Sequence, residues 1–327
     1  MTAGGFAAVI LAAGHGTRMK SSLPKILHEA AGRPLLEHVI RAVAPLAPAR
    51  TLVVIGHGAE RVRSRFAAHD VSFVLQQEQL GTGHALQTAL PALEKFAGDV
   101  MVLTGDCPLL TSETLAELRD GHQQSGAGMT MLTYRVTDPS GLGRIVRDEQ
   151  GRLTQIVEEK DASEAEREID EINPGLFIFD RHVFDFTRKL SNDNAQGEYY
   201  LTDLPGLYLE AALGIHTVEG RDETGLLVGV NDRRELACAE RILRERIRRR
   251  WLASGVSMLA PDQTFIDDTV ELGRDVLLEQ GVILKGEVRL GEGVRVGAYS
   301  VLEDLELAAG EVIAPHTVRS GGAAKPS

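Results

Sequence analysis

The sequence has few cysteines, few aromatic residues and no long hydrophobic run. Its two cysteines, Cys107 and Cys238, lie far apart, which excludes a disulfide framework and a cysteine-based zinc site. No apolar stretch reaches the ~20 residues that a membrane-spanning helix needs, so we expect no membrane partner. The apolar N-terminus has no basic segment before it, which argues against a signal peptide and predicts a cytoplasmic protein.

Positive charge is also scarce. The chain has 35 lysines and arginines against 47 aspartates and glutamates, a net charge of -12. Binding of nucleic acid depends on clustered cations, so we expect no nucleic-acid partner. Arg18, Lys20 and Lys25 are nevertheless close together in the sequence, and this local positive charge suits a small anionic ligand.

With 327 residues, of which 43% are hydrophobic, the chain has enough material for two domains. In residues 1–231, short apolar runs alternate with helix-like stretches. This alternation predicts an α/β, Rossmann-like doubly wound domain, which binds its ligands at the carboxyl ends of the strands. The expected strands are 6–11, 52–56 and 100–106, and the expected helices are 34–47, 58–68, 84–95 and 111–124.

Residues 232–254 read as one long helix, a linker arm that begins after Asp232 and ends at Gly255. It carries a basic run, Arg244 to Arg250, which we interpret as a solvated face paired with glutamates.

Beyond the arm, residues 255–320 have a period of six. Such a repeat predicts a left-handed parallel β-helix, in which each hexad forms one face of a triangular prism. We expect about three coils, followed by a disordered tail at 321–327. The repeat is marked by Val270, Val276, Val282, Val288, Val294, Val312 and Val318.

A glycine-rich loop, residues 11–19, follows the first predicted strand. Gly14 and Gly16 allow the backbone to approach phosphate oxygens, Arg18 adds a planar charged fork, and Lys25 adds a second cation. Taken alone, the loop is equally compatible with a bare tight turn.

Together with segments 76–85, 104–109 and 229–232, this loop resembles the nucleotide-binding fingerprint of sugar nucleotidyltransferases. The combination is similar to the uridylyltransferase half of bacterial N-acetylglucosamine-1-phosphate uridyltransferases, and the resemblance covers nearly the whole chain. The resemblance implies that Arg18 and Lys25 are catalytic and that glutamine amides read uracil. The implied nucleotide contacts are Leu11, Ala12, Ala13, Gly14, Gly16, Gln76, Gln79, Gly81 and Thr82.

The same resemblance implies a Mg²⁺ site formed by Asp106 and Asn231, since Mg²⁺ prefers hard oxygen ligands. Without the resemblance, both residues are equally compatible with helix caps. The acceptor sugar phosphate is expected to contact four further residues: Gly143, Glu158, Asn173 and Thr202.

The resemblance therefore implies transfer of UMP from UTP to N-acetylglucosamine-1-phosphate, giving UDP-N-acetylglucosamine for cell-wall synthesis. It also implies a homotrimer assembled through the β-helix. Because the repeat is short, we expect no acetyltransferase site. The alternatives are a glucose-1-phosphate or dTTP enzyme, a non-catalytic assembly subunit and a hexapeptide acyltransferase.

Overall fold

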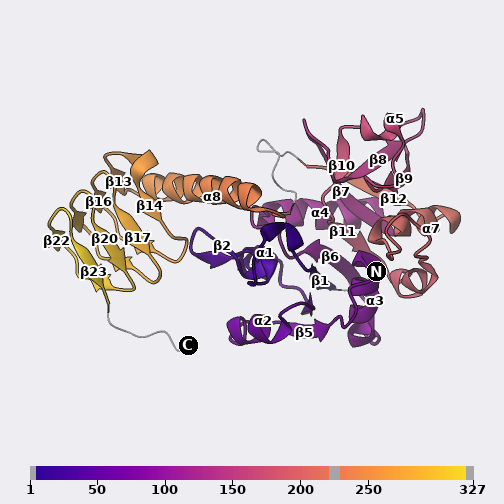
Figure 1. Cartoon of the computed structure of the whole chain (residues 1–327), viewed down its shortest axis with the longest axis horizontal. Helices are drawn as coiled ribbons and strands as arrows, with labels where there is room; N and C mark the ends of the chain where they lie inside the picture. The colour runs from indigo at the N-terminus through magenta and orange to yellow at the C-terminus, as the bar shows by residue number, and fades with distance from the viewer. Residues whose placement is uncertain (1–4, 221–228, 322–327) are drawn as a thin grey trace. The chain divides into compact units, whose positions relative to one another are not determined.

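The computed structural model describes residues 5–220 and 229–321 (Figure 1). The chain forms two compact units. The larger contains residues 1–27 and 35–233, and the smaller contains residues 28–34 and 234–327. Except for Gly321, the tail predicted to be disordered lies outside the described residues. Within the described part of the chain, no helix is both long enough and apolar enough to cross a membrane.

A ten-stranded sheet organises the larger unit, with the order β5-β4-β1-β6-β11-β7-β10-β8-β9 and β12 paired to β7. Its strands are β1 (Phe6–Ala12), β4 (Arg50–Ile55), β5 (Ser72–Leu75), β6 (Asp99–Thr104), β7 (Met129–Arg135), β8 (Gly143–Arg147), β9 (Leu153–Val157), β10 (Glu171–Asn173), β11 (Phe177–Phe179) and β12 (Ile215–Glu219). Its helices are α1 (Leu35–Val43), α2 (Ala59–Arg65), α3 (Thr82–Ala89), α4 (Ser112–Ser125), α5 (Glu164–Arg167), α6 (Val183–Phe186) and α7 (Leu204–Glu210).

The first four strands in the sheet order are parallel, and β1 lies between β4 and β6. After β1 the chain builds one side of the sheet through β4 and β5, then crosses to β6 on the other side. Strand order therefore reverses at β1, and a ligand crevice is expected at the carboxyl ends of β1 and β6. The almost unbroken apolar sequence of β1 fits burial on both faces.

The remaining strands make the sheet mixed. Strand β11 runs antiparallel to both β6 and β7, and β10 runs antiparallel to β7 and β8. The predicted α/β class is confirmed, with the parallel arrangement concentrated around β1. The antiparallel part carries the segments that the sequence assigned to the acceptor.

The smaller unit combines helix α8 (Arg233–Ala253) with three narrow parallel sheets, which form a short β-helix. Its strands are β13 (Ser257–Met258), β14 (Phe265–Ile266), β15 (Glu271–Leu272), β16 (Leu277–Leu278), β17 (Ile283–Lys285), β18 (Arg289–Leu290), β19 (Arg295–Val296), β20 (Val301–Glu303), β21 (Glu306–Leu307), β22 (Val312–Ile313) and β23 (Val318–Ser320).

A hairpin from early in the chain also belongs to this unit. It consists of β2 (Glu29–Ala30) and β3 (Arg33–Pro34). The Asp268 amide donates to the Ala31 carbonyl at 2.8 Å, and the Arg33 guanidinium pairs with the Asp268 carboxylate at 2.8 Å. The Ala31 amide donates to Glu240 of α8. No local pattern in the sequence indicates this long-range association.

The expectation that Val312 and Val318 continue the inward-facing repeat is wrong, because their exposed fractions are 70% and 80%. Ile283 pairs with Val301, 18 residues later, whereas Val301 pairs with Val318 after only 17. One residue fewer in this coil shifts the inward-facing positions along the sequence. Leu305, Leu307 and Ile313 are buried there instead.

The basic run on α8 is paired with acidic residues, as predicted, but it is less solvated than expected. Arg244 pairs with Glu240, and Arg248 and Arg249 both pair with Glu245. The side chains of Arg244 and Arg248 are largely buried, and Arg244 also reaches Asp267 at 3.3 Å. These arginines therefore help to join the helix to the β-helix.

Candidate active site

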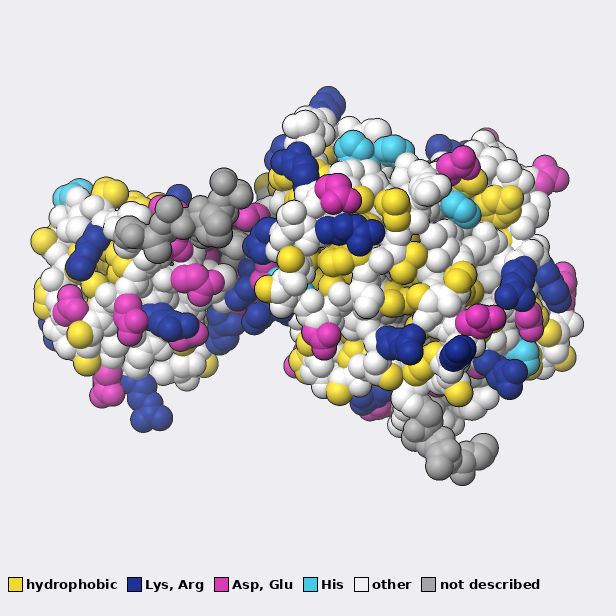
Figure 2. Space-filling view, turned by 90° about the horizontal axis from the view of Figure 1, so that it is seen from below, with side chains coloured by type: hydrophobic (Ala, Val, Ile, Leu, Met, Phe, Trp, Pro, Cys, Tyr) yellow, Lys and Arg dark blue, Asp and Glu magenta, His cyan; other side chains and the backbone are white. Residues whose placement is uncertain are grey.

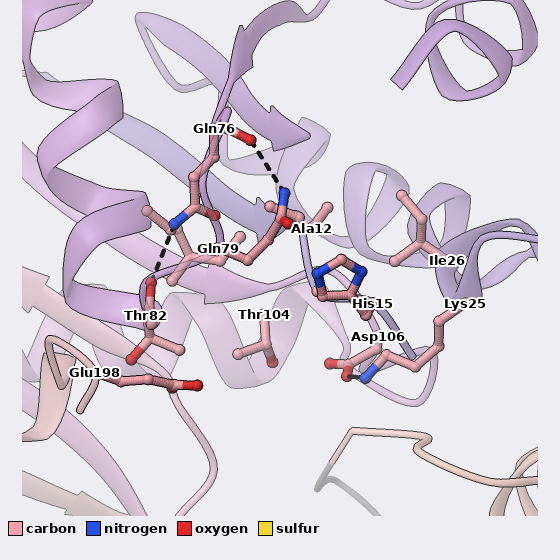
Figure 3. A pocket seen from close by; sticks show the side chains of 15 residues that line it. Ala12, His15, Lys25, Ile26, Gln76, Gln79, Thr82, Thr104, Asp106 and Glu198 are labelled. Carbon is pink, nitrogen blue, oxygen red and sulfur yellow. Dashed lines mark hydrogen bonds and ion pairs between the residues drawn. The ribbon is translucent and has the colours of Figure 1, made fainter. Parts of the chain in front are cut away.

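A pocket of about 300 Å³ opens beside the carboxyl ends of β1 and β6 (Figure 3). Ten of the residues that the sequence singled out line it: Leu11, Ala12, Ala13, Gly14, Lys25, Gln76, Gln79, Gly81, Thr82 and Asp106. Gln76 and Gln79 lie at one end, and Lys25 and Asp106 at the other. The crevice expected from the reversal of strand order is therefore present, and it has an amide end and a charged end.

The two glycines of the glycine loop, Gly14 and Gly16, have different surroundings. Gly14 lines the pocket and has open space where a side chain would project. Gly16 has a φ of 61°, and a Cβ there would lie 2.6 Å from Lys25 Cβ. Gly16 therefore allows the loop to pack against the lysine. Arg18 is exposed in the 3₁₀ turn Thr17–Met19 and is absent from the pocket lining.

At the charged end, the Lys25 ammonium group pairs with the Asp106 carboxylate and donates to Asn231 Oδ1 at 3.1 Å. The side chains of Lys25 and Asp106 are only 15% and 14% exposed. A Cβ on Gly229 would collide with the Asp106 carboxylate, so a glycine is required there. Residues from three distant segments thus converge on one point.

Two hard oxygen atoms, one from Asp106 and one from Asn231, face a common positive charge, the Lys25 ammonium. This donor set suits a divalent cation that takes its other ligands from phosphate and water. In residues 5–220 and 229–321, no three His, Cys, Asp or Glu side chains cluster as a complete metal site.

At the amide end, Gln76 is buried, and its Nε2 lies 3.2 Å from the Gly81 carbonyl and 3.0 Å from His84 Nδ1. Gln79 Nε2 donates to the Gln76 carbonyl at 3.2 Å. These bonds fix both amide planes. Fixed donors and acceptors are what recognition of a flat, polar base edge requires.

Gly81 and Thr82 also hold a distant segment in place. The Gly83 amide donates to the Tyr199 carbonyl at 2.8 Å, and the Leu201 amide donates to Thr82 Oγ1 at 3.1 Å. Gly81 has a φ of 103°, and a Cβ there would lie 2.6 Å from the Tyr199 carbonyl oxygen. This close approach brings Glu198 into the pocket lining.

The expected acceptor residues lie outside this pocket lining, and three of them are close together. Thr202 donates to the Glu158 carboxylate at 2.7 Å, and the Cα of Gly143 faces the same carboxylate. Burial raises the pKa of Glu158. Burial, followed by the charges of Glu158 and Asp161, raises the pKa of Asp203 to about 6. Closely spaced carboxylates of this kind suit sugar hydroxyls, which donate hydrogen bonds.

Asn173 has a different environment. Its side chain is buried, donates to the Leu132 carbonyl at 3.1 Å and accepts from the Gly175 amide at 2.8 Å. It therefore shapes the turn after β10, and one amide hydrogen remains for a ligand. Gly175 in turn packs against Thr104, which lines the pocket.

Sequence reasoning did not assign five of the pocket-lining residues: His15, Ile26, Ala85, Thr104 and Glu198. All five stand inside or next to motifs that had been singled out. Glu198 is held in the lining by bonds of its neighbours Tyr199 and Leu201 to residues 80–83.

Comparison with known proteins decides the family. The model of the MobA-like NTP transferase domain matches residues 8–206. The bifunctional protein GlmU of Pelobacter propionicus is 45% identical over 330 residues, covering 94% of this chain and 71% of that protein. The bifunctional protein GlmU of Streptococcus suis is 43% identical, covering 94% and 66%.

The chain belongs to the GlmU family. The resemblance inferred from the motifs is thereby confirmed, and the larger unit contains an NTP transferase domain. The chain spans about two thirds of the length of the GlmU relatives that it matches. The contacts assigned to individual site residues remain predictions.

Proposed function

We propose that this protein transfers UMP from UTP to N-acetylglucosamine-1-phosphate, producing UDP-N-acetylglucosamine and pyrophosphate for cell-wall precursor synthesis. The observation that carries the proposal is the single pocket that joins fixed glutamine amides to a lysine and an aspartate. The amides fit a pyrimidine edge, and the charged end fits the phosphates. Membership of the GlmU family supports the same substrates.

In the proposed reaction, a phosphate oxygen of the sugar phosphate attacks the α-phosphorus of UTP. The new P–O bond forms as the bond to pyrophosphate breaks. The attacking oxygen is already ionised and needs no general base. The protein therefore acts by positioning the reactants and neutralising charge.

Lys25 holds the positive charge closest to the proposed transfer site, and Arg18 supplies a second cation from the exposed turn of the glycine loop. Asp106 and Asn231 would hold Mg²⁺, which when bound polarises phosphoryl oxygens. Gln76 and Gln79 orient the uracil base, while Gly143, Glu158, Asn173 and Thr202 bind the sugar phosphate. Each group needs only to be correctly placed before the reaction begins.

The proposal is tested by incubating the protein with UTP, N-acetylglucosamine-1-phosphate and Mg²⁺. Pyrophosphate release and the nucleotide-sugar product are measured together. We expect equimolar amounts of both, and no product when either substrate is omitted or EDTA is added. Pyrophosphate release without UDP-N-acetylglucosamine would refute the proposed acceptor. A parallel assay with acetyl-CoA and glucosamine-1-phosphate tests the expectation of no acetyl transfer.

We also propose that the protein works in the cytoplasm, where UTP is available, as a homotrimer assembled through the β-helix. The β-helix exposes large apolar side chains, including Leu259, Phe265 and Tyr299. Exposed apolar surface of this kind favours association between chains. Light scattering should give three times the chain mass of 35.4 kDa; a monomer would contradict the assembly without affecting the proposed reaction.

A further inference from the structure

The turn Gly56–Gly58 connects β4 to α2, and none of its residues lines the pocket. It was not among the predicted site residues. It nevertheless packs against three segments that form the nucleotide site: the glycine loop, the segment before Lys25, and the glutamine segment. A small turn with three such neighbours is well placed to set their relative positions.

One end of this turn lies against the amide end of the pocket. The Gln76 amide donates to the Ile55 carbonyl at 2.8 Å, which fixes the start of the glutamine segment. A Cβ on Gly56 would lie 2.5 Å from Gln79 Nε2 and 2.7 Å from the Ala13 carbonyl oxygen. The Gln79 side-chain amide can move away from such a Cβ, whereas displacing the Ala13 backbone is energetically costly. A glycine at 56 therefore lets Gln79 and the glycine loop share this space.

The other end of the turn lies against the segment that carries Lys25. Gly58 has a φ of 69°, and a Cβ there would collide with the ring of Pro24. The Arg61 guanidinium, one turn further on, donates to the Ser22 carbonyl at 3.2 Å. Because Pro24 directly precedes Lys25, any displacement of its ring reaches the lysine through one peptide bond.

We propose that the Gly56–Gly58 turn is a positioning element that keeps the base-reading amides and the phosphate-binding lysine at a fixed separation. Gly56 sets the place of Gln79, and Gly58 sets the place of Lys25. The turn touches no substrate and acts only through these neighbours. This inference rests on the proposed function, because it assigns the two pocket ends to base and phosphate.

Two single substitutions separate the two ends. Gly56→Ala should lower kcat/KM for UTP by about 10- to 100-fold and reduce the preference for UTP over CTP by about 10-fold, because small displacements of a recognising group are costly. Gly58→Ala should lower kcat by about 10-fold and leave the UTP-to-CTP preference within about two-fold of wild type. If the turn had a purely structural role, neither substitution would change base preference, and the two variants would not differ in which kinetic property they affect.

Matched controls come from glycines with open space around them. Gly206→Ala controls for adding a methyl group. Gly151→Ala, at a position with a φ of 77°, controls for the backbone strain of alanine at positive φ. Melting temperatures report whether each variant folds. If Gly58→Ala fails to fold, Arg61→Gln provides the second test of the lysine end, since it removes the bond to Ser22 and should lower kcat by about three-fold without changing base preference.

The inference is overturned if Gly56→Ala keeps wild-type base preference, or if folded Gly58→Ala or Arg61→Gln keeps wild-type kcat. Assaying the wild-type protein in the same series distinguishes a failure of this inference from a failure of the proposed function. No nucleotide-sugar product from wild type would refute the proposed function. An active wild type with unaffected variants would refute the positioning role alone.

Discussion

The two ends of the proposed reaction site are built in different ways. The nucleotide pocket is lined by glycine backbone, glutamine amides and a lysine, and its polar side chains are held by bonds to main-chain carbonyls or to one another. The acceptor side is acidic: burial, followed by the charge of Asp161, raises the pKa of Glu158, and burial, followed by the charges of Glu158 and Asp161, raises the pKa of Asp203. The nucleotide pocket thus offers fixed amides and one lysine, which pairs with Asp106, whereas the acceptor side offers carboxylates to hydroxyl groups.

One face of the larger unit shows no comparable separation of charge (Figure 2). On the visible face of the larger unit, lysine and arginine side chains alternate with aspartate and glutamate (Figure 2). The comparison between the two ends leads to four predictions.

The largest effect is expected at the charged end of the nucleotide pocket. Lys25→Ala removes the positive charge held between Asp106 and Asn231, and it should lower kcat by about 100-fold or more with any acceptor. Steady-state assays should show this loss, while the exposed Lys95→Ala control stays near wild type. Near-normal turnover in folded Lys25→Ala would contradict the proposal that the charged end of the pocket neutralises phosphate charge.

Asp106→Asn keeps the shape of the side chain and removes its charge. It should raise the Mg²⁺ concentration needed for half-maximal activity by about 10- to 100-fold, because a carboxylate is the stronger ligand. A Mg²⁺ titration of activity measures this, with the exposed Asp120→Asn as the control. An unchanged Mg²⁺ requirement would show that Asp106 is not the ligand.

Glu158→Gln tests the acceptor side separately. The glutamine carbonyl still accepts from Thr202, but the loss of charge should raise KM for the sugar phosphate by about 10-fold. KM for UTP should stay constant, because the glutamine amides of the nucleotide pocket are untouched. Glu168→Gln, on the surface, is the control. Equal increases in both KM values would mean that the two ends are not independent.

The smallest effect concerns stability. The pKa of Asp203 is about 6, above its ordinary value of about 3.9, so the unfolded chain releases this proton first as pH rises. The resulting penalty on folding is absent below about pH 4, grows until about pH 6 and is then constant.

Asp203→Asn cannot ionise, so it should be more stable than wild type at pH 7.5 by about 1 kcal/mol at most, since the side chain remains partly open to solvent. The difference should shrink at pH 5. Urea unfolding at both pH values measures this, and a difference that grows on acidification would contradict it.

Local patterns in the sequence were enough to predict the α/β class, the connecting helix and the β-helix, because each has its own periodicity. The motifs also identified ten residues that line one pocket. Local patterns did not reveal the bonds from Thr82 and Gly83 to residues 199–201, or the place of Gly56 beneath Gln79. These contacts join residues far apart in the sequence, and no periodicity records them.

The β-helix shows the same limit on a smaller scale. Its six-residue period correctly predicted stacked parallel strands, yet one residue fewer between Val301 and Glu306 reversed the expected orientation of Val312. Likewise, residues 28–34 belong to the smaller unit, where Arg33 forms an ion pair with Asp268. A register change or a distant ion pair becomes visible only in three dimensions.

The most direct test of two separately built ends is a competition assay. The protein is given all four nucleoside triphosphates together with glucose-1-phosphate, glucosamine-1-phosphate and N-acetylglucosamine-1-phosphate, and the nucleotide sugars formed are identified by mass spectrometry. We predict UDP-N-acetylglucosamine as the dominant product, and for each acceptor a preference for UTP of similar size. A dominant product with another base or sugar, or a base preference that changes with the acceptor, would contradict this account.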